Sequence, residues 1–313
     1  MIVVFGSLNI DMLLRVERLP HPGETVKCPF YDWVPGGKGA NQAVAAARAA
    51  GTKAKVAMVG KVGDDGFGTR SLNNLKREGI HVSGVGLSAL PTGCASVIFD
   101  RSGENQIVVA SGANSDTTAD QVPNEILGPD NVVLMQMEVR PDENWSLIQR
   151  ARAKGATTIL NLAPALAVPK YALESLDYLI VNQIEARQIA EKLDLHIEDD
   201  AMALAHALAK SCSLTCIITI GPRGSVASKG DESWRMPAMQ LDEVVDTTGS
   251  GDAYCGAFAA AIHAKKNLAE ALKRASIAGS LACTKAGAQA GLPLDSDIDA
   301  HLDKVPDAQH GTL

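Results

Sequence analysis

Short apolar runs alternate with alanine-rich segments of helical periodicity along most of the chain. The apolar runs have the length of strands buried on both faces, and they lie at Ile2–Phe5, Lys55–Val59, Val132–Met137, Thr157–Leu160, Tyr178–Val181 and Cys216–Ile220. The helical segments lie at Ala40–Ala50, Thr69–Glu78, Glu143–Ala153, Glu185–Leu193, Ala201–Ser211 and Gly251–Ala264. Strands that alternate with helices form mostly parallel sheets covered on both faces, so the pattern predicts an α/β fold.

Two stretches interrupt this alternation. Met12–Trp33 is rich in turn residues and has little helical periodicity. Cys94–Ser111 has the pattern of two strands around the sequence DRSGEN, which is typical of a hairpin. We expect these stretches to form a small β-sheet lid at 12–34 and 94–111. The lid would be carried by an α/β body at 1–11, 35–93 and 112–306, and residues 307–313 are expected to form a disordered tail.

The overall charge limits the class of partner. The formal net charge is −7, whereas proteins that bind nucleic acids or anionic membranes need a basic face. A length of 313 residues allows a sizeable buried core. The first residues lack a signal-peptide pattern, and the longest apolar run, around Ala253–Ala264, is too short to span a bilayer. We therefore expect a cytoplasmic protein that binds neither nucleic acid nor membrane.

The cysteines and histidines do not have the spacing of metal ligands. The six cysteines contain no C-x-x-C pair, and no two of the seven histidines lie four residues apart. This spacing favours buried free thiols in a reducing compartment and disfavours a zinc-type site.

The sequence DTTGSGDA begins at Asp246 and places glycines, hydroxyls and two acids directly before an apolar helix. One interpretation is a loop with an aspartate N-cap, which requires neither the second glycine nor the second acid. The other is an anion cradle, in which Gly249 and Gly251 let backbone N–H groups converge at a positive helix N-terminus. Asp252 would then be an acid at the mouth of the cradle, and the helix start would favour its ionised form.

Two polar motifs follow the first strand. In GSLNID, Asn9 and Asp11 lie two residues apart, so they point the same way in extended backbone and suit neighbouring sugar hydroxyls, unless they form an Asx turn. In PGGKGANQA, three glycines let the backbone approach a ligand, and Lys38, Asn41 and Gln42 lie in the first turn of a helix. The motif is not a Walker A loop, and the first strand is not followed by the G-x-G-x-x-G of a Rossmann site.

Three further polar groups follow later strands. In LIVNQIEA, Asn182 and Glu185 have the spacing of a capping box, and Glu185 could equally face a hydrated Mg²⁺ held on phosphates. TIGPRG is either an ordinary β-turn or a phosphate contact through Arg223. Glu138 stands at the end of the strand VVLMQM. Because the carboxyl ends of parallel strands share one edge of a sheet, these groups predict the rim of a ligand crevice.

The motifs GGKGANQA, LNID and DTTGSGDAYCGAF together resemble the ribokinase branch of the PfkB carbohydrate-kinase family, over residues 2–300. The resemblance implies a three-layer α/β/α sandwich with a mostly parallel central sheet and a small β-sheet lid. It implies transfer of the γ-phosphoryl group of ATP, with Mg²⁺ and K⁺, to O5 of D-ribose, which gives D-ribose 5-phosphate. It also implies a homodimer paired through the lids, whose strand edges would otherwise be exposed.

The resemblance also assigns roles to individual residues. The sugar would be held by Asn9, Asp11, Gly37, Lys38, Asn41, Glu138 and Asp252. ATP would contact Asn182, Thr219, Gly221, Gly224, Gly251 and Ser276, and Glu185 would place Mg²⁺ through water. Gly249 and Gly251 would form the anion hole, and Asp252 would be the catalytic base. The K⁺ loop would comprise Asp246, Thr248 and the backbone around Ala282, Lys285, Gly287 and Gly291.

Three residues depart from the usual pattern of the family. Ser250 stands where alanine is usual, Ser276 where asparagine is frequent near the adenine, and Gly291 where serine is frequent in the K⁺ loop. Two alternative hypotheses stay open. The chain is either another kinase of the family, acting on a different pentose, a ketohexose or a nucleoside, or a sugar-binding regulator that has lost phosphoryl transfer. The second alternative predicts that the base or an anion-hole glycine is missing, whereas Asp252, Gly249 and Gly251 are all present.

Overall fold

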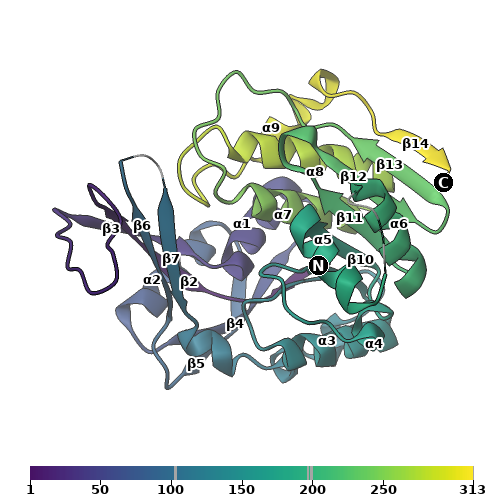
Figure 1. The fold of residues 1–313 in the computed structure, drawn as a ribbon. Coiled ribbons are helices and arrows are strands. Elements are labelled where there is room, and N and C mark those ends of the chain that lie inside the picture. Colours follow the sequence, from purple (N-terminus) through teal and green to yellow (C-terminus); the bar gives the residue numbers. More distant parts are fainter. Residues whose placement is uncertain (102–103, 196, 198–199, 313) are drawn as a thin grey trace.

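The predicted apolar runs form the centre of a ten-stranded sheet in the computed structural model, which describes residues 1–101, 104–195, 197 and 200–312 (Figure 1). Its parallel part has the order β11-β10-β9-β8-β1-β4-β5. These strands are β1 (Ile2–Phe5), β4 (Val56–Gly63), β5 (His81–Ser88), β8 (Val132–Gln136), β9 (Thr157–Asn161), β10 (Tyr178–Asn182) and β11 (Thr215–Thr219). The antiparallel strands β12 (Ser225–Lys229), β13 (Glu232–Met236) and β14 (Gln309–Thr312) extend the sheet beyond β11.

Helices cover both faces of this sheet, which gives the expected three layers. Successive side chains of β1 enter opposite cores, with Ile2 and Val4 in one and Val3 and Phe5 in the other. The first core is covered by α1 (Lys38–Ala50), α2 (Gly66–Arg77), α7 (Ser250–His263), α8 (Leu268–Ala282) and α9 (Asp295–Asp299). The second is covered by α3 (Pro141–Lys154), α4 (Lys170–Leu173), α5 (Gln183–Lys192) and α6 (Ala201–Cys212). Short 3₁₀ helices lie at Gly112–Asp116, Ala119–Gln121, Asn124–Ile126, Gly221–Arg223 and Leu302–Lys304.

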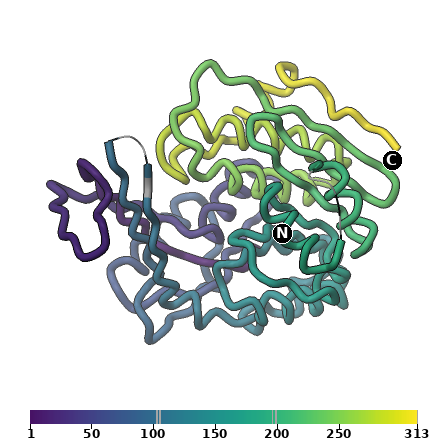
Figure 2. The backbone as a smooth tube through the Cα atoms, in the orientation of Figure 1, coloured from purple at the N-terminus to yellow at the C-terminus, as the bar shows by residue number. Residues whose placement is uncertain are grey.

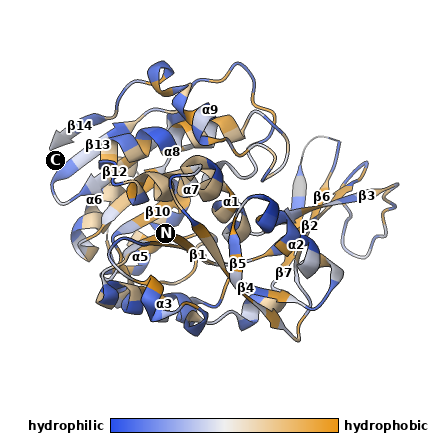
Figure 3. Ribbon diagram, turned by 180° about the vertical axis from the view of Figure 1, so that it is seen from behind, coloured by the Kyte–Doolittle hydropathy of each residue, from blue (hydrophilic) through white to orange (hydrophobic). Residues whose placement is uncertain are grey.

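Hydropathy follows the layers. Figure 3 shows that hydrophobic residues lie along the central strands, whereas hydrophilic residues lie on the outer sides of the helices. Of the helices in the described part of the chain, none is both long and apolar enough to cross a membrane.

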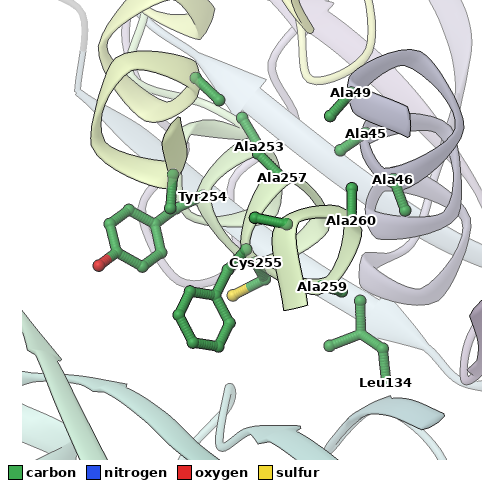
Figure 4. Close-up of a cluster of buried hydrophobic side chains, with 14 of the residues drawn as sticks. Ala45, Ala46, Ala49, Leu134, Ala253, Tyr254, Cys255, Ala257, Ala259 and Ala260 are labelled. Atoms are coloured by element: carbon green, nitrogen blue, oxygen red, sulfur yellow. The ribbon is translucent and has the colours of Figure 1, made fainter. Parts of the chain in front are cut away.

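The helices α1 and α7 pack closely because the residues between them are small. Figure 4 shows the buried alanines Ala45 and Ala46 of α1 beside Ala257 and Ala260 of α7. At Gly256 of α7, an added Cβ would lie only 2.6 Å from the backbone nitrogen of Ala46 and 2.8 Å from the carbonyl oxygen of Gln42. This close packing brings the N-terminal turns of the two helices together.

A second, four-stranded sheet stands apart from the body at one end of the molecule, among the described residues (Figure 2). Its order is β3-β2-β6-β7, with β2 (Asn9–Arg15), β3 (Tyr31–Gly36), β6 (Gly93–Phe99) and β7 (Asn105–Ala110). The hairpin of β6 and β7 agrees with the prediction for Cys94–Ser111, although Ser102 and Gly103 of its turn lie outside the described residues. β2 begins at Asn9 and β3 ends at Gly36, so both strands extend beyond the predicted lid segment 12–34.

The prediction of a disordered tail at 307–313 is wrong for the residues that form β14. This strand pairs with β13 from Gln309 to Thr312, while Leu313 lies outside the described residues. The edge of β13 offers unpaired backbone groups, which a short polar segment can satisfy whatever its own hydrophobicity. The ring of His310 also stacks on that of Trp234, with a centroid distance of 4.9 Å.

Candidate active site

Asp252 lies in the first turn of α7, and its carboxylate is buried with 7% exposure. Its Oδ2 accepts a hydrogen bond of 3.0 Å from Asn41 Nδ2, and its Oδ1 accepts one of 2.9 Å from Gln42 Nε2. Burial raises the pKa of Asp252 above its ordinary value, although Lys38, Gln42 and Asn41 act in the opposite direction. The sequence predicts that the helix start favours the ionised form, whereas in the structure desolvation of the carboxylate is the larger effect and favours the protonated form.

Lys38 is the cation of a cluster of acids around Asp252. Burial lowers the pKa of Lys38, but Asp252, Glu138, Glu185 and Cys255 outweigh burial and hold the pKa above its ordinary value. Nearby, burial together with the charges of Glu138 and Asp252 raises the pKa of Asp11 to about 6. The predicted residues Asp11, Lys38, Glu138, Glu185 and Asp252 therefore share one electrostatic environment.

Glu138 is fixed to the start of α1. Its Oε2 accepts a hydrogen bond of 2.6 Å from the hydroxyl of Ser7 and one of 2.9 Å from the backbone nitrogen of Lys38. The same Ser7 hydroxyl accepts a hydrogen bond of 3.1 Å from the backbone nitrogen of Gly39. An added Cβ at Gly39 would lie 2.5 Å from the backbone nitrogen of Ser7, so only glycine permits this close approach.

Asn9 lines a smaller pocket of about 320 Å³ together with Asn114 and Glu138. Asn114 is buried, and its Nδ2 donates a hydrogen bond of 2.7 Å to Asn9 Oδ1. Its Oδ1 accepts one of 2.8 Å from the backbone nitrogen of Leu8, which fixes the start of β2. Gly37 has a φ of +86°, and an added Cβ would lie 2.8 Å from the backbone nitrogen of Asn9. The small pocket is thus built from the start of β2, the residues around the 3₁₀ helix at Gly112–Asp116 and the residues that follow β8.

A larger pocket of about 550 Å³ lies at the carboxyl end of β11, and the predicted nucleotide residues Thr219, Gly221, Gly224, Gly251 and Ser276 are in its lining. The hydroxyl of Ser276 donates a hydrogen bond of 2.8 Å to the carbonyl oxygen of Pro237, so its oxygen is already engaged. Both pockets have the volume of small-molecule sites.

Asn182 is not among the lining residues of the larger pocket. Its Oδ1 accepts a hydrogen bond of 2.8 Å from the backbone nitrogen of Glu185, and Glu185 Oε2 accepts one of 2.8 Å from the backbone nitrogen of Asn182. This is the capping box that the sequence offered as the structural alternative. Burial raises the pKa of Glu185 above its ordinary value.

The predicted K⁺ loop is assembled by Asp246. Its Oδ1 accepts a hydrogen bond of 2.9 Å from the backbone nitrogen of Thr248, and its Oδ2 accepts one of 2.8 Å from that of Gly287. Burial raises the pKa of Asp246, but these hydrogen bonds outweigh it and hold the pKa below its ordinary value. An added Cβ at Gly291 would collide with the carbonyl oxygen of Ala282, so this backbone requires glycine there. Lys285 is exposed.

Gly249, the first predicted anion-hole residue, precedes α7 with a φ of +81°. An added Cβ would lie 2.5 Å from the carbonyl oxygen of Ala288, so this position also requires glycine. Gly251 has open space around its Cα, and it lines the larger pocket.

Several residues that hold this site together have no role in the sequence-based prediction. Ser7 supports Glu138, Asn114 supports Asn9, and Gln42 supports Asp252. The triplet GAN occurs at 39–41 and again at 112–114, and both asparagines reach the site.

Comparisons with known proteins agree on one family. The family model described as pfkB family carbohydrate kinase matches residues 1–295. The ribokinase of Bacillus subtilis is 36% identical over 304 residues, covering 96% of this chain and 99% of that protein. The deoxyribokinase of Salmonella typhimurium is 30% identical over 306 residues, covering 96% and 98%. The solved structure of Arabidopsis thaliana ribokinase complexed with ribose and ATP is 28% identical, with a TM-score of 0.86 and coverage of 96% and 98%.

Proposed function

Because the chain belongs to the pfkB family of carbohydrate kinases, we propose that it is an ATP-dependent ribokinase, which phosphorylates O5 of D-ribose. The observation that carries the proposal is the buried carboxylate of Asp252, which lines neither pocket itself but has neighbours that line both. Gly251, one residue before it, lines the larger pocket, and Glu138, whose charge acts on it, lines the smaller. A base at this position faces a sugar hydroxyl on one side and the γ-phosphoryl group of ATP on the other.

The mechanism rests on positioning and charge neutralisation. Asn9, Asp11, Gly37, Lys38, Asn41 and Glu138 hold the sugar hydroxyls. The adenine nucleotide occupies the pocket lined by Thr219, Gly221, Gly224 and Ser276, next to Asn182 at the end of β10. The hydroxyl oxygen of ribose attacks the γ-phosphorus, the bond to the β-γ bridging oxygen breaks, and Asp252 accepts the hydroxyl proton. The N–H groups of Gly249 and Gly251 stabilise the charge that develops on the phosphoryl oxygens.

Mg²⁺ fits the carboxylate of Glu185, because Oε2 accepts the N–H of Asn182 whereas Oε1 accepts no hydrogen bond among the described residues. A single carboxylate that acts through water is the usual protein contribution to a magnesium–phosphate site. When bound, Mg²⁺ supplies positive charge to the phosphates.

The six cysteines are all free, which supports a reducing compartment and hence the cytoplasm.

The direct test is ADP release with ribose, deoxyribose, fructose, adenosine and fructose 6-phosphate as acceptors. We expect ribose to give the highest kcat/KM and the product to carry its phosphate on O5. The similarity to a deoxyribokinase makes deoxyribose the informative competitor. Preference for adenosine or fructose would favour the alternative kinases, and no release with any acceptor would favour the sugar-binding regulator.

We expect K⁺ to raise turnover several-fold over tetramethylammonium. The carboxylate of Asp246 joins both halves of the predicted K⁺ loop next to Gly249, so an ion bound by oxygens there would order the anion hole. Asp246→Ala should remove most of the response, whereas Asp242→Ala, in an exposed acid of the same segment, should keep it. Equal rates of wild-type protein in the two salts would contradict a functional K⁺ site.

We expect a homodimer with an interface that includes residues from 12–34 and 94–111. Among the residues that the structure describes, the outer strands of the lid sheet pair on one side only, and β7 exposes Ile107, Val108 and Val109 by 56%, 69% and 50%. Exposed apolar strand edges associate unless they are covered. In light scattering at micromolar concentration, Val108→Lys should shift the protein toward monomer. Ile184→Lys, at a body residue that is 65% exposed, should not. A wild-type monomer with full activity would contradict the interface.

A further inference from the structure

Gln42 is the residue of α1 that faces Asp252 without a role in the proposed sugar or nucleotide site. Its side chain is completely buried, and its Nε2 lies 2.9 Å from Asp252 Oδ1 and 2.9 Å from Asn161 Oδ1. Its Oε1 accepts a hydrogen bond of 2.7 Å from Gln136 Nε2. Gln42 therefore joins the carboxylate to side chains from the ends of β8 and β9.

The direction of these hydrogen bonds follows from the groups at their ends. An ionised carboxylate only accepts hydrogen bonds, so Gln42 must present its NH₂ group to Asp252. Asn161 donates its own NH₂ group to the carbonyl oxygen of Ile180, at 3.1 Å, and so presents its oxygen to Gln42. Both neighbours of Gln42 Nε2 are thus acceptors, and the side chain of Gln42 has only one orientation that satisfies them.

The amide of Gln136 is the unfavourable member of this hydrogen-bond network. Its NH₂ group must point to Gln42 Oε1, and its own Oε1 is buried without a hydrogen-bond partner among the residues that the structure describes. A buried oxygen without a partner is costly, and a rotation of the amide would place it against Gln42 Oε1 instead. The orientation of the amides in this hydrogen-bond network is therefore set by Asp252, whose ionised carboxylate requires a donor.

We propose that Gln42 is the positioning residue that holds Asp252 as an ionised, correctly oriented proton acceptor, an inference that rests on the proposed kinase function. Asn41 Nδ2 binds the other carboxylate oxygen, at 3.0 Å, so two consecutive residues of one helix fix both oxygens. The close packing of α1 on α7 at Gly256 makes this geometry possible. Loss of the Gln42 donor leaves Oδ1 buried and unpaired, which favours the protonated form of Asp252.

Other titratable groups also face Asp252, and they stay in place when Gln42 changes. They are Lys38 from α1, Glu138 after β8, Asp11 from β2 and Cys255 from α7. A difference between wild type and a Gln42 variant therefore reports on the donor that is lost.

The test compares Gln42→Met with Asn144→Leu. Methionine keeps the length of the side chain and removes the donor. Asn144 is also completely buried and donates a hydrogen bond of 2.7 Å to the carbonyl oxygen of Gln136, but it does not touch Asp252. The pKa of Asp252 is measured by ¹³C carboxyl NMR, with the resonance assigned through Asp252→Asn. We expect Gln42→Met to raise this pKa by about one unit, the scale of a hydrogen bond to a charged group.

Kinetics supply the second measurement. Since the base must be ionised, a higher pKa moves the acidic limb of the kcat profile to higher pH, and on that limb a shift of one unit should lower kcat by up to about tenfold. The KM for ribose should stay within about threefold, because sugar contacts are intact. Asn144→Leu should lose stability and move neither the pKa nor the profile.

A folded Gln42→Met protein with an unshifted Asp252 pKa and the kcat of the Asn144→Leu control would overturn the inference. If Gln42→Met does not fold, Gln42→Asn withdraws the amide from Asp252 but keeps a polar group in the network, and the same shift is expected. A wild-type protein that phosphorylates no sugar would contradict the proposed function, while the NMR titration would still decide the role of Gln42.

Discussion

Asp252→Asn is expected to fold, to bind sugar and ATP, and to lose at least about 10²–10⁴ in turnover, the scale of removing a general base. The substitution keeps the shape of the buried side chain and removes its charge. Because the transition state of phosphoryl transfer is loose, the hydroxyl becomes acidic late, and a carboxylate is then sufficient as base. Burial raises the pKa of Asp252, which brings it closer to the operating pH and makes the carboxylate a better proton acceptor.

The alternative treats Asp252 as a first-turn helix acid without a catalytic role. In that case its loss costs a fraction of a kcal/mol of stability and leaves turnover nearly intact. Glu270→Gln is the matched control, because Glu270 is the first-turn acid of α8 and lies in the capping box with Asn267. Turnover of folded Asp252→Asn above about a tenth of wild type, well short of the general-base loss, would refute the catalytic assignment.

Lys38→Met is expected to reduce turnover by about 10²–10³, the scale of removing one electrostatic stabiliser from an active site. Methionine replaces the buried stem of the lysine, so the fold should persist. The acids Asp252, Glu138 and Glu185 would then lack the cation that they share. Loss of Lys38 also raises the pKa of Asp252, so the acidic limb of the kcat profile should move to higher pH.

Lys154→Met provides the comparison, because Lys154 is an exposed residue in the last turn of α3, a helix of the opposite layer. It should leave kcat and the pH profile unchanged. A Lys38→Met protein with turnover within tenfold of wild type and an unmoved acidic limb would show that the cation is dispensable.

The roles of Ser7 and Asn114 show where inference from the sequence stops. Asn9 and Asp11 were identified because a short motif after a strand has a periodicity that can be interpreted locally. Ser7 lies next to them, but its partner Glu138 is 131 residues away, and the partner Asn114 of Asn9 is 105 residues away. No local pattern in the sequence predicts hydrogen bonds between side chains that lie so far apart along the chain. The glycines at 37 and 39 are expected from the sequence to let the backbone approach a ligand, whereas in the structure an added Cβ at these positions would meet backbone atoms of Asn9 and Ser7.

The sequence by itself determined the alternation of strands and helices, the hairpin of the lid and the polar motifs at the carboxyl ends of strands. These features depend on periodicity and on glycine, which act over a few residues. Tertiary structure decided the pairing of β14 with β13, the burial that raises the pKa of Asp252, and the hydrogen bond from Gln42 to a residue 210 positions later. Desolvation and hydrogen bonds between distant residues exist only after α1 has packed on α7, because the small residues of that contact bring the two helix starts together.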